Sequence, residues 1–120
     1  MKVLIIDDEP EVTEMICQYM SLKNNNCTIK NSGKEGLEEL HKNSFDAVIL
    51  DLSMPGVSGY DILDELKKQN KISSHNILVL TALNLNLDDE EELERRGVKR
   101  VLRKPVGLQE LYSMLEEITT

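Results

Sequence analysis

The sequence predicts an α/β fold: a five-stranded parallel sheet in a three-layer α/β/α sandwich. Two observations support this prediction. Short apolar runs alternate with amphipathic segments five times along the chain, and several of the runs end abruptly in polar or acidic residues. Strands joined by helical crossovers run parallel, with right-handed connections. With 120 residues, the chain is expected to form a single domain over residues 1–120 that needs no disulfide bonds.

Five apolar runs are predicted to be strands. Residues 3–6, 47–50 and 77–80 are aliphatic and rich in β-branched types, which is typical of strands buried on both faces. Residues 27–30 are only weakly apolar, and this indicates an edge strand. A short fifth strand is expected at residues 98–102.

Five helices are predicted between and after these strands. The first spans residues 10–22, the second opens after Ser32 as its N-cap, and the third covers residues 60–68. The fourth, residues 88–96, is acidic and has Leu93 as its only apolar residue, so weak anchoring is expected. Two helices carry a full apolar stripe at helical spacing: Val12, Met15, Ile16, Tyr19 and Met20 in the first, and Leu108, Leu111, Tyr112, Leu115 and Ile118 in the last.

Composition argues against several classes of function. Acidic residues outnumber basic ones 22 to 14, giving a net charge of −8, and no basic cluster interleaved with aromatics is available to bind nucleic acid directly. No apolar run approaches the roughly 20 residues of a membrane span. Cys17 and Cys27 show no Cys-x-x-Cys spacing and are interpreted as small buried hydrophobes, which fits a reducing, cytoplasmic setting.

Acidic residues follow two of the apolar strands. Asp51 comes directly after residues 47–50, and Asp7 and Asp8 come directly after residues 2–6. In a doubly wound sheet of order 2-1-3-4-5, the ligand crevice opens between the first and third strands, beside these acids. Three carboxylates at one edge repel each other unless a cation neutralises them, and Mg²⁺ is the hard, oxygen-seeking ion that such a set suits.

Two further strand ends bring complementary groups to the same edge. The fourth strand runs into Thr81, a hydroxyl, and the fifth runs toward Lys104, an ammonium. A carboxylate nucleophile at Asp51, a metal, a hydroxyl and a lysine are the groups that phosphoryl transfer onto an aspartate requires. Each residue taken singly could equally be a loop polar residue, whereas the set together favours this function.

These motifs resemble the receiver domain of the two-component response-regulator family, over residue 1 to about residue 118. The matching residues occur in the family order and spacing: Asp7-Asp8, Asp51 with Met54-Pro55-Gly56 and Gly59, Thr81-Ala82, and Lys104-Pro105. The resemblance implies the flavodoxin-like, receiver-type fold. It also implies a signalling phosphoacceptor, which catalyses its own phosphorylation and dephosphorylation, rather than an enzyme acting on another substrate.

The resemblance assigns roles to the acids. Asp51 would accept the phosphoryl group from a histidine kinase or a histidine phosphotransfer protein. Asp8, Asp51 and the backbone carbonyl of Ser53 would bind Mg²⁺ directly, and Asp7 would assist through water. A downstream protein target or an output domain would then read the surface around the fourth helix, fifth strand and fifth helix.

The resemblance also assigns roles at the end of the fifth strand, where the chain departs from the family in part. Thr81 and Lys104 would hold the phosphoryl oxygens, and the bond to Pro105 would be cis. Family members often carry an aromatic residue where this chain has Val101, and another where it has Val106. Residues 81–97 are also about one residue longer than the family pattern. These departures concern the output surface and leave the acceptor site intact.

Three alternatives share parts of this pattern. A flavin-binding protein of similar topology would need hydroxyls and glycines after the first strand, where this chain has Asp7-Asp8-Glu9. A haloacid-dehalogenase-like phosphatase would carry Asp-x-Asp there and a cap domain. An interaction module with the same fold that works without phosphorylation remains an alternative that only a phosphorylation assay separates.

Overall fold

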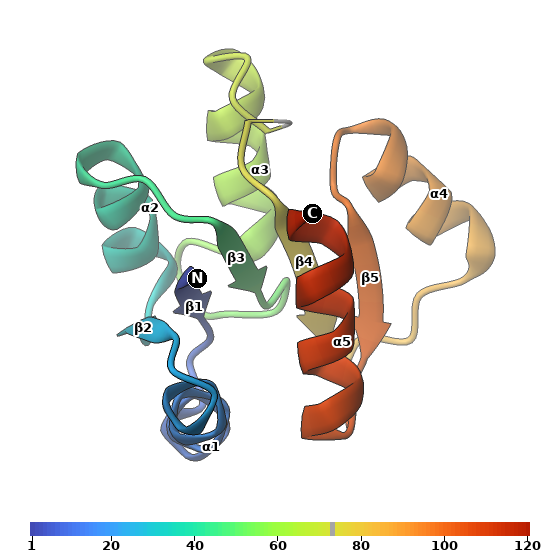
Figure 1. The fold of residues 1–120 in the computed structure, drawn as a ribbon. Helices are drawn as coiled ribbons and strands as arrows, with labels where there is room; N and C mark the ends of the chain where they lie inside the picture. The colour runs from blue at the N-terminus through green and yellow to red at the C-terminus, as the bar shows by residue number, and fades with distance from the viewer. Residues whose placement is uncertain (73) are drawn as a thin grey trace.

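A computed structural model describes residues 1–72 and 74–120 as one parallel sheet between two helical layers (Figure 1). The five strands are β1 (Lys2–Ile6), β2 (Asn26–Lys30), β3 (Ala47–Leu50), β4 (Ile77–Thr81) and β5 (Arg100–Arg103). They pair in the order β2-β1-β3-β4-β5, and every pair is parallel. The predicted fold class and strand order are therefore confirmed.

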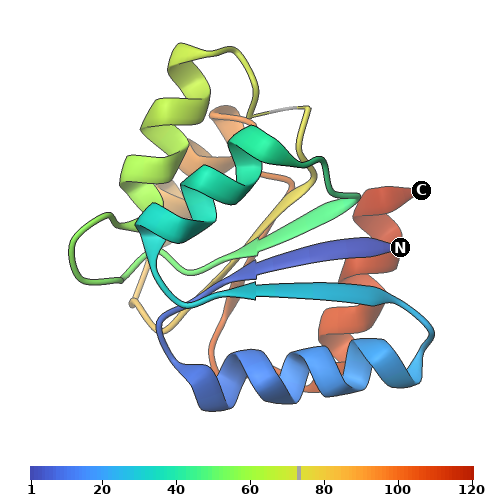
Figure 2. The same ribbon diagram turned by 90° about the vertical axis from the view of Figure 1, so that its left-hand side faces the viewer.

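Five helices connect and follow the strands. They are α1 (Pro10–Leu22), α2 (Gly33–Lys42), α3 (Gly59–Lys68), α4 (Leu87–Arg95) and α5 (Leu108–Thr119). α1 and α5 cover one face of the sheet, and α2, α3 and α4 cover the other (Figure 2). None of the helices in the described ranges is long and apolar enough to cross a membrane.

Alternate residues of each central strand supply two separate hydrophobic cores. In β1, Val3 and Ile5 pack with α1 and α5, while Leu4 and Ile6 pack with α2, α3 and α4. β3 and β4 follow the same alternation. The near-continuous aliphatic runs in the sequence therefore reflect strands that are buried on both faces.

The structure differs from the sequence prediction in local detail. Met15, predicted to face the core, is 48% exposed and lies beside an open apolar groove between α1 and α5, because neither helix closes over it. β5 begins at Arg100 rather than at Val98, which is buried just before the strand. Ser32 does cap α2, accepting a hydrogen bond from the Glu35 backbone N–H.

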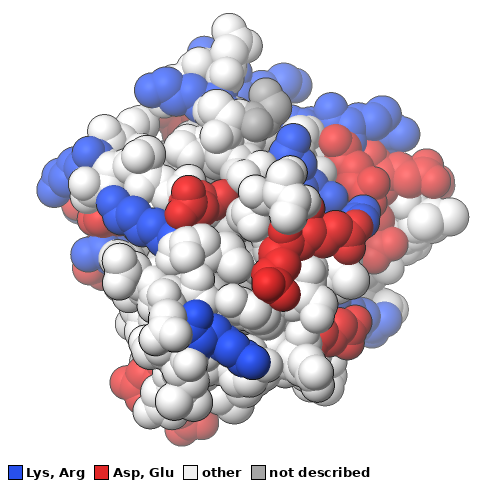
Figure 3. Space-filling view, in the orientation of Figure 1, with Lys and Arg blue, Asp and Glu red and all other residues white. Residues whose placement is uncertain are grey.

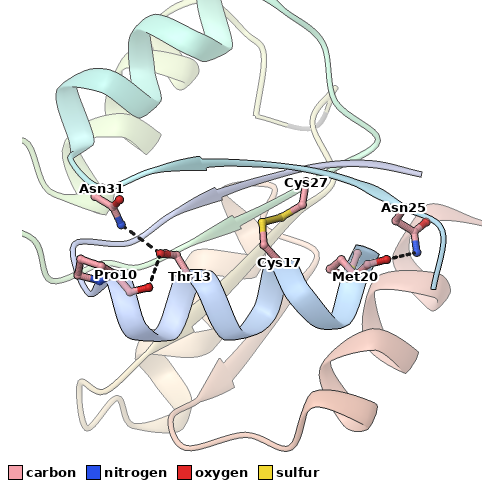
Figure 4. The surroundings of a disulfide bond; sticks show 7 residues. All are labelled: Pro10, Thr13, Cys17, Met20, Asn25, Cys27 and Asn31. Carbon is pink, nitrogen blue, oxygen red and sulfur yellow. Dashed lines mark hydrogen bonds between the residues drawn. A yellow bond between two sulfur atoms is a disulfide. The ribbon is translucent and has the colours of Figure 1, made fainter. Parts of the chain in front are cut away.

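The interpretation of the two cysteines was wrong. Cys17 of α1 and Cys27 of β2 form a disulfide, with their Cα atoms 5.5 Å apart (Figure 4). Helix α1 packs against the edge strand β2, so residues ten apart in sequence are brought face to face. Both cysteines are partly buried, and their pairing ties the helix to the sheet edge.

Candidate functional site at the carboxyl edge of the sheet

The register of β1 and β3 brings the predicted acids together. Ile6 pairs with Leu50, and Asp7 and Asp51 follow these residues directly. The Asp51 backbone N–H donates to the Ile6 carbonyl over 3.0 Å, so the two strands stay paired up to the acids. Asp7 and Asp51 are only 2% and 4% exposed. Both acids are thus buried side by side at the ends of adjacent strands.

Four carboxylates converge at this point. One oxygen from each of Asp7, Asp8, Glu9 and Asp51 lies within 4.8 Å of the others. Carboxylate oxygens are the donors that Mg²⁺ takes in proteins, usually one or two with water in the remaining positions. The donor set therefore fits Mg²⁺, and it lacks the nitrogen and sulfur ligands that select zinc.

Lys104 reaches into the cluster from the end of β5. Its ammonium lies 2.7 Å from Asp7 Oδ2, 3.0 Å from Glu9 Oε1 and 3.6 Å from Asp51 Oδ2. The Lys104 backbone N–H donates to the Thr81 carbonyl over 2.8 Å, which fixes the start of the loop. The peptide bond between Lys104 and Pro105 is cis, the isomer expected there.

The net effect of burial and neighbouring charges is to raise the pKa of two of these groups, Asp51 and Lys104. Burial raises the pKa of the Asp51 carboxyl, and repulsion from Asp7 raises it further, although the Ser53 N–H and Lys104 oppose the shift. Burial lowers the pKa of the Lys104 ammonium, but hydrogen bonds to Asp7 and Glu9 outweigh it and leave that pKa above its ordinary value. Four carboxylates facing one ammonium leave the site short of positive charge.

The loop after β3 is shaped around Asp51. Ser53 donates its backbone N–H to Asp51 Oδ1 over 3.2 Å, which leaves Oδ2 on the side of Lys104. The first residue of α3, Gly59, packs so closely that an added Cβ would lie 2.2 Å from the Asp51 carbonyl oxygen. A glycine is therefore required for α3 to begin beside the acid.

Thr81 lies at the same edge. It is the last residue of β4 and is 1% exposed. On the neighbouring strand β3, Leu50 pairs with Val79, so Asp51 and Thr81 both follow this pair at the same end of the sheet. Its Oγ1 accepts a hydrogen bond from the Leu83 backbone N–H over 3.1 Å. The hydroxyl proton remains available to another acceptor, since that bond uses only a lone pair.

Two residues at the site make contacts that the sequence did not predict. Glu9 was read only as part of an acidic run, yet its side chain pairs with Lys104, 95 residues away. Asn31, after β2, donates to the Asp7 carbonyl over 2.8 Å. It also donates to Thr13 Oγ1 over 3.2 Å (Figure 4), and so ties the acidic loop to β2 and α1. The acidic run itself was the available signal for Glu9, whereas no sequence signal marked Asn31.

Fold and site together define a doubly wound α/β domain that gathers acids, a threonine and a lysine at the carboxyl edge of its sheet. The family model of the response regulator receiver domain matches residues 3–116. The chain belongs to this family, whose members act in two-component signal transduction.

Known proteins resemble the chain in sequence and in structure. It is 33% identical over 118 residues to the transcriptional regulatory protein QseB of Escherichia coli O157:H7, covering 98% of this chain and 52% of that protein. The chain spans about half the length of the curated relatives it matches.

Two solved structures show the likeness in three dimensions. The Francisella response regulator 1452 receiver domain is 27% identical, with a TM-score of 0.89 and coverage of 98% of this chain and 95% of that one. The response regulator TrrA of Thermotoga maritima, solved in complex with Mg²⁺-BeF, is 27% identical, with a TM-score of 0.81 and coverage of 98% and 99%.

Proposed function

We propose that residues 1–120 form one receiver domain in which Asp51 is the phosphoacceptor. The donor is the phosphohistidine of a histidine kinase or of a histidine phosphotransfer protein. The observation that carries this proposal is the position of Asp51, a buried carboxylate at the end of the central strand with the Lys104 ammonium 3.6 Å away. Membership of the receiver family supports it.

The proposed transfer needs little covalent chemistry from the protein. An Asp51 carboxylate oxygen attacks phosphorus, the bond between phosphorus and the histidine nitrogen breaks, and the nitrogen keeps the electron pair and takes up a proton. In dephosphorylation, a separate step, water attacks phosphorus and loses a proton to solvent, and the bond between phosphorus and the Asp51 oxygen breaks to give inorganic phosphate and the free carboxylate. Positioning and charge neutralisation then account for most of the rate.

The chain's own residues divide the remaining work. Asp8, Asp51 and the Ser53 carbonyl would hold Mg²⁺ directly, and Asp7 would assist through water. Bound Mg²⁺ neutralises charge on the transferring phosphoryl oxygens. Lys104 pairs with one phosphoryl oxygen, and the Thr81 hydroxyl donates to another, which its free proton allows.

The signal is proposed to leave through the surface around α4, β5 and α5. Thr81 moves toward the phosphoryl group and draws residues 82–86 with it, and α4 follows because Leu93 is its only buried side chain. Val101 packs partly buried against the same core, where it has no ring to turn. The signal is proposed to act on a downstream protein or an output domain. The name of the related QseB, a transcriptional regulatory protein, supports this.

We place this chemistry in the cytoplasm, where the proposed kinase partner presents its phosphohistidine. Disulfides are uncommon in that compartment because its thiol pools reduce them. In the cytoplasm, the Cys17–Cys27 disulfide would therefore interconvert with its reduced form, in which both cysteines are free thiols.

A mass measurement tests the phosphoacceptor directly. Incubation with acetyl phosphate and Mg²⁺ should add the mass of one phosphoryl group to the protein, and hydroxylamine should remove it. Asp51→Asn should abolish the addition. Asp88→Asn, which changes an exposed aspartate of α4, should leave it intact. Full labelling of the Asp51 variant would overturn the assignment, and no labelling of the native protein by any phosphodonor would favour the phosphorylation-independent module.

A further inference from the structure

Helix capping does not explain why residue 9 is a glutamate. Glu9 is the N-cap of α1, where Ser, Thr, Asp or Asn would satisfy the free backbone N–H groups. The Glu9 side chain makes no capping bond, while its backbone is fixed, accepting from the N–H groups of Val12 and Thr13 and donating to Asp7 Oδ1. The side chain is thus free for another contact, and it makes that contact with Lys104.

The two nearest carboxylate partners of Lys104, Asp7 and Glu9, differ in how easily their contact with the ammonium can be broken. Asp7, at 2.7 Å, has a side chain only 3% exposed, so breaking its contact with Lys104 would leave a buried carboxylate without its cation. Glu9, at 3.0 Å, has a side chain 57% exposed, so water can replace the ammonium at little cost. An ammonium has three protons to donate. A new oxygen arriving near Asp51 would therefore displace Glu9 first.

We propose that Glu9 is a positioning residue that shares the Lys104 ammonium with Asp7 and Asp51 in the unphosphorylated protein and releases it to the phosphoryl group. This inference rests on the proposed function of Asp51. Because the ion pair between Glu9 and Lys104 stabilises only the unphosphorylated form, Glu9 lowers the affinity of the site for a phosphoryl group. The length of the Glu9 side chain matters as well as its charge, since the contact spans from the N-cap of α1 to the end of β5.

Beryllofluoride, a stable phosphoryl mimic, measures this effect at saturating Mg²⁺ by calorimetric titration. Glu9→Gln should bind it roughly two- to fivefold more tightly than the native protein, the range that an exposed ion pair carries. Glu9→Asp keeps the charge but shortens the reach by one methylene, so it should show a gain of similar size. Glu11→Gln removes an exposed charge from the same helical turn and should bind like the native protein.

Each contrary result has a distinct meaning. Equal affinities in all variants, or a gain in Glu9→Gln without one in Glu9→Asp, would overturn the positioning role, the second because charge alone would then suffice. A matching gain in Glu11→Gln would do the same. A titration with Mg²⁺ alone should give affinities within twofold of native, and a loss in the Glu9 variants would make Glu9 a metal ligand instead. Failure of the native protein to bind beryllofluoride would overturn the proposed function, and this inference with it.

Discussion

The two edges of the sheet hold their helices in different ways. At the β2 edge, α1 buries Thr13, Ile16 and Met20 and is tied to the strand by the Cys17–Cys27 disulfide. At the β5 edge, α4 buries only Leu93. The acidic site lies between these two regions. The difference shows which half of the molecule can respond to a change at Asp51, since a weakly anchored helix moves at lower cost than a covalently tied one.

Charge accentuates the contrast. The first turn of α4 carries Asp88, Asp89 and Glu90, and acidic side chains gather over this helix in Figure 3. These acids interact favourably with the N-terminal end of the helix dipole and are joined by the capping box between Asn86 and Asp89, so they stabilise the helix itself but do not attach it to the sheet. The second attachment of α4 is at its other end, where Arg96 pairs with Asp64 of α3.

Truncating one core residue in each region should expose the difference most strongly. Ile16→Ala should cost about 2–5 kcal/mol of global stability, because α1 cannot leave the sheet to relieve the cavity. Leu93→Ala should cost less, about 1–2 kcal/mol, because the loss is limited to the free energy that holds α4 in place. Urea unfolding of both variants measures this, and equal costs would contradict the comparison.

Removing the disulfide should weaken the α1 side by a smaller amount. Its sequence separation of ten closes a short loop, for which chain entropy predicts about 2–3 kcal/mol. Denaturation of the native protein with and without a reductant gives the difference in the free energy of unfolding. The Cys17→Ser, Cys27→Ser double variant should be as stable as the reduced protein, and its stability should not change when reductant is added. Alkylation without reduction should leave the oxidised protein unmodified, and labelling of both cysteines would contradict the pairing.

The fold could be predicted from sequence because burial on two faces leaves a plain pattern. The aliphatic runs at residues 3–6 and 47–50 and the acids after them indicated both the strand ends and the edge at which a ligand is expected. The position of Asp51 and Lys104 at this edge could be predicted for the same reason, since each residue follows a strand of the parallel sheet.

The features that escaped prediction depend on side-chain reach rather than on periodicity. Spacing alone does not show that the Cα atoms of Cys17 and Cys27 lie within disulfide distance, because this depends on how α1 lies across β2. The contact between Glu9 and Lys104 likewise requires the loops after β1 and β5 to converge. Met15 fits the apolar stripe of α1 but lies at its margin, beside the groove that α5 leaves open.

Replacing Asp51 by a neutral residue should change the stability by less than the core and disulfide variants do. Because the pKa of Asp51 is raised, this change should be a gain at pH 7. A carboxyl whose pKa is higher in the folded state stabilises the fold at low pH and loses that contribution as the pH rises from 3.8 through the folded value. Asp51→Asn has no such loss, so without Mg²⁺ it should melt higher than the native protein at pH 7. Thermal unfolding against pH measures this, and adding Mg²⁺ should stabilise the native protein more than the variant. A lower melting temperature for the variant at pH 7 without Mg²⁺ would contradict the account.

The central claim is that a phosphoryl group at Asp51 is read out on the α4 side and not on the α1 side. Hydrogen exchange with and without Mg²⁺ and beryllofluoride tests it across the whole chain in one measurement. Exchange should change most in residues 82–97 and around Lys104, while residues 12–30, held by the disulfide, should stay nearly constant. Changes concentrated in residues 12–30, or flat exchange in residues 82–97 with the mimic demonstrably bound, would contradict it.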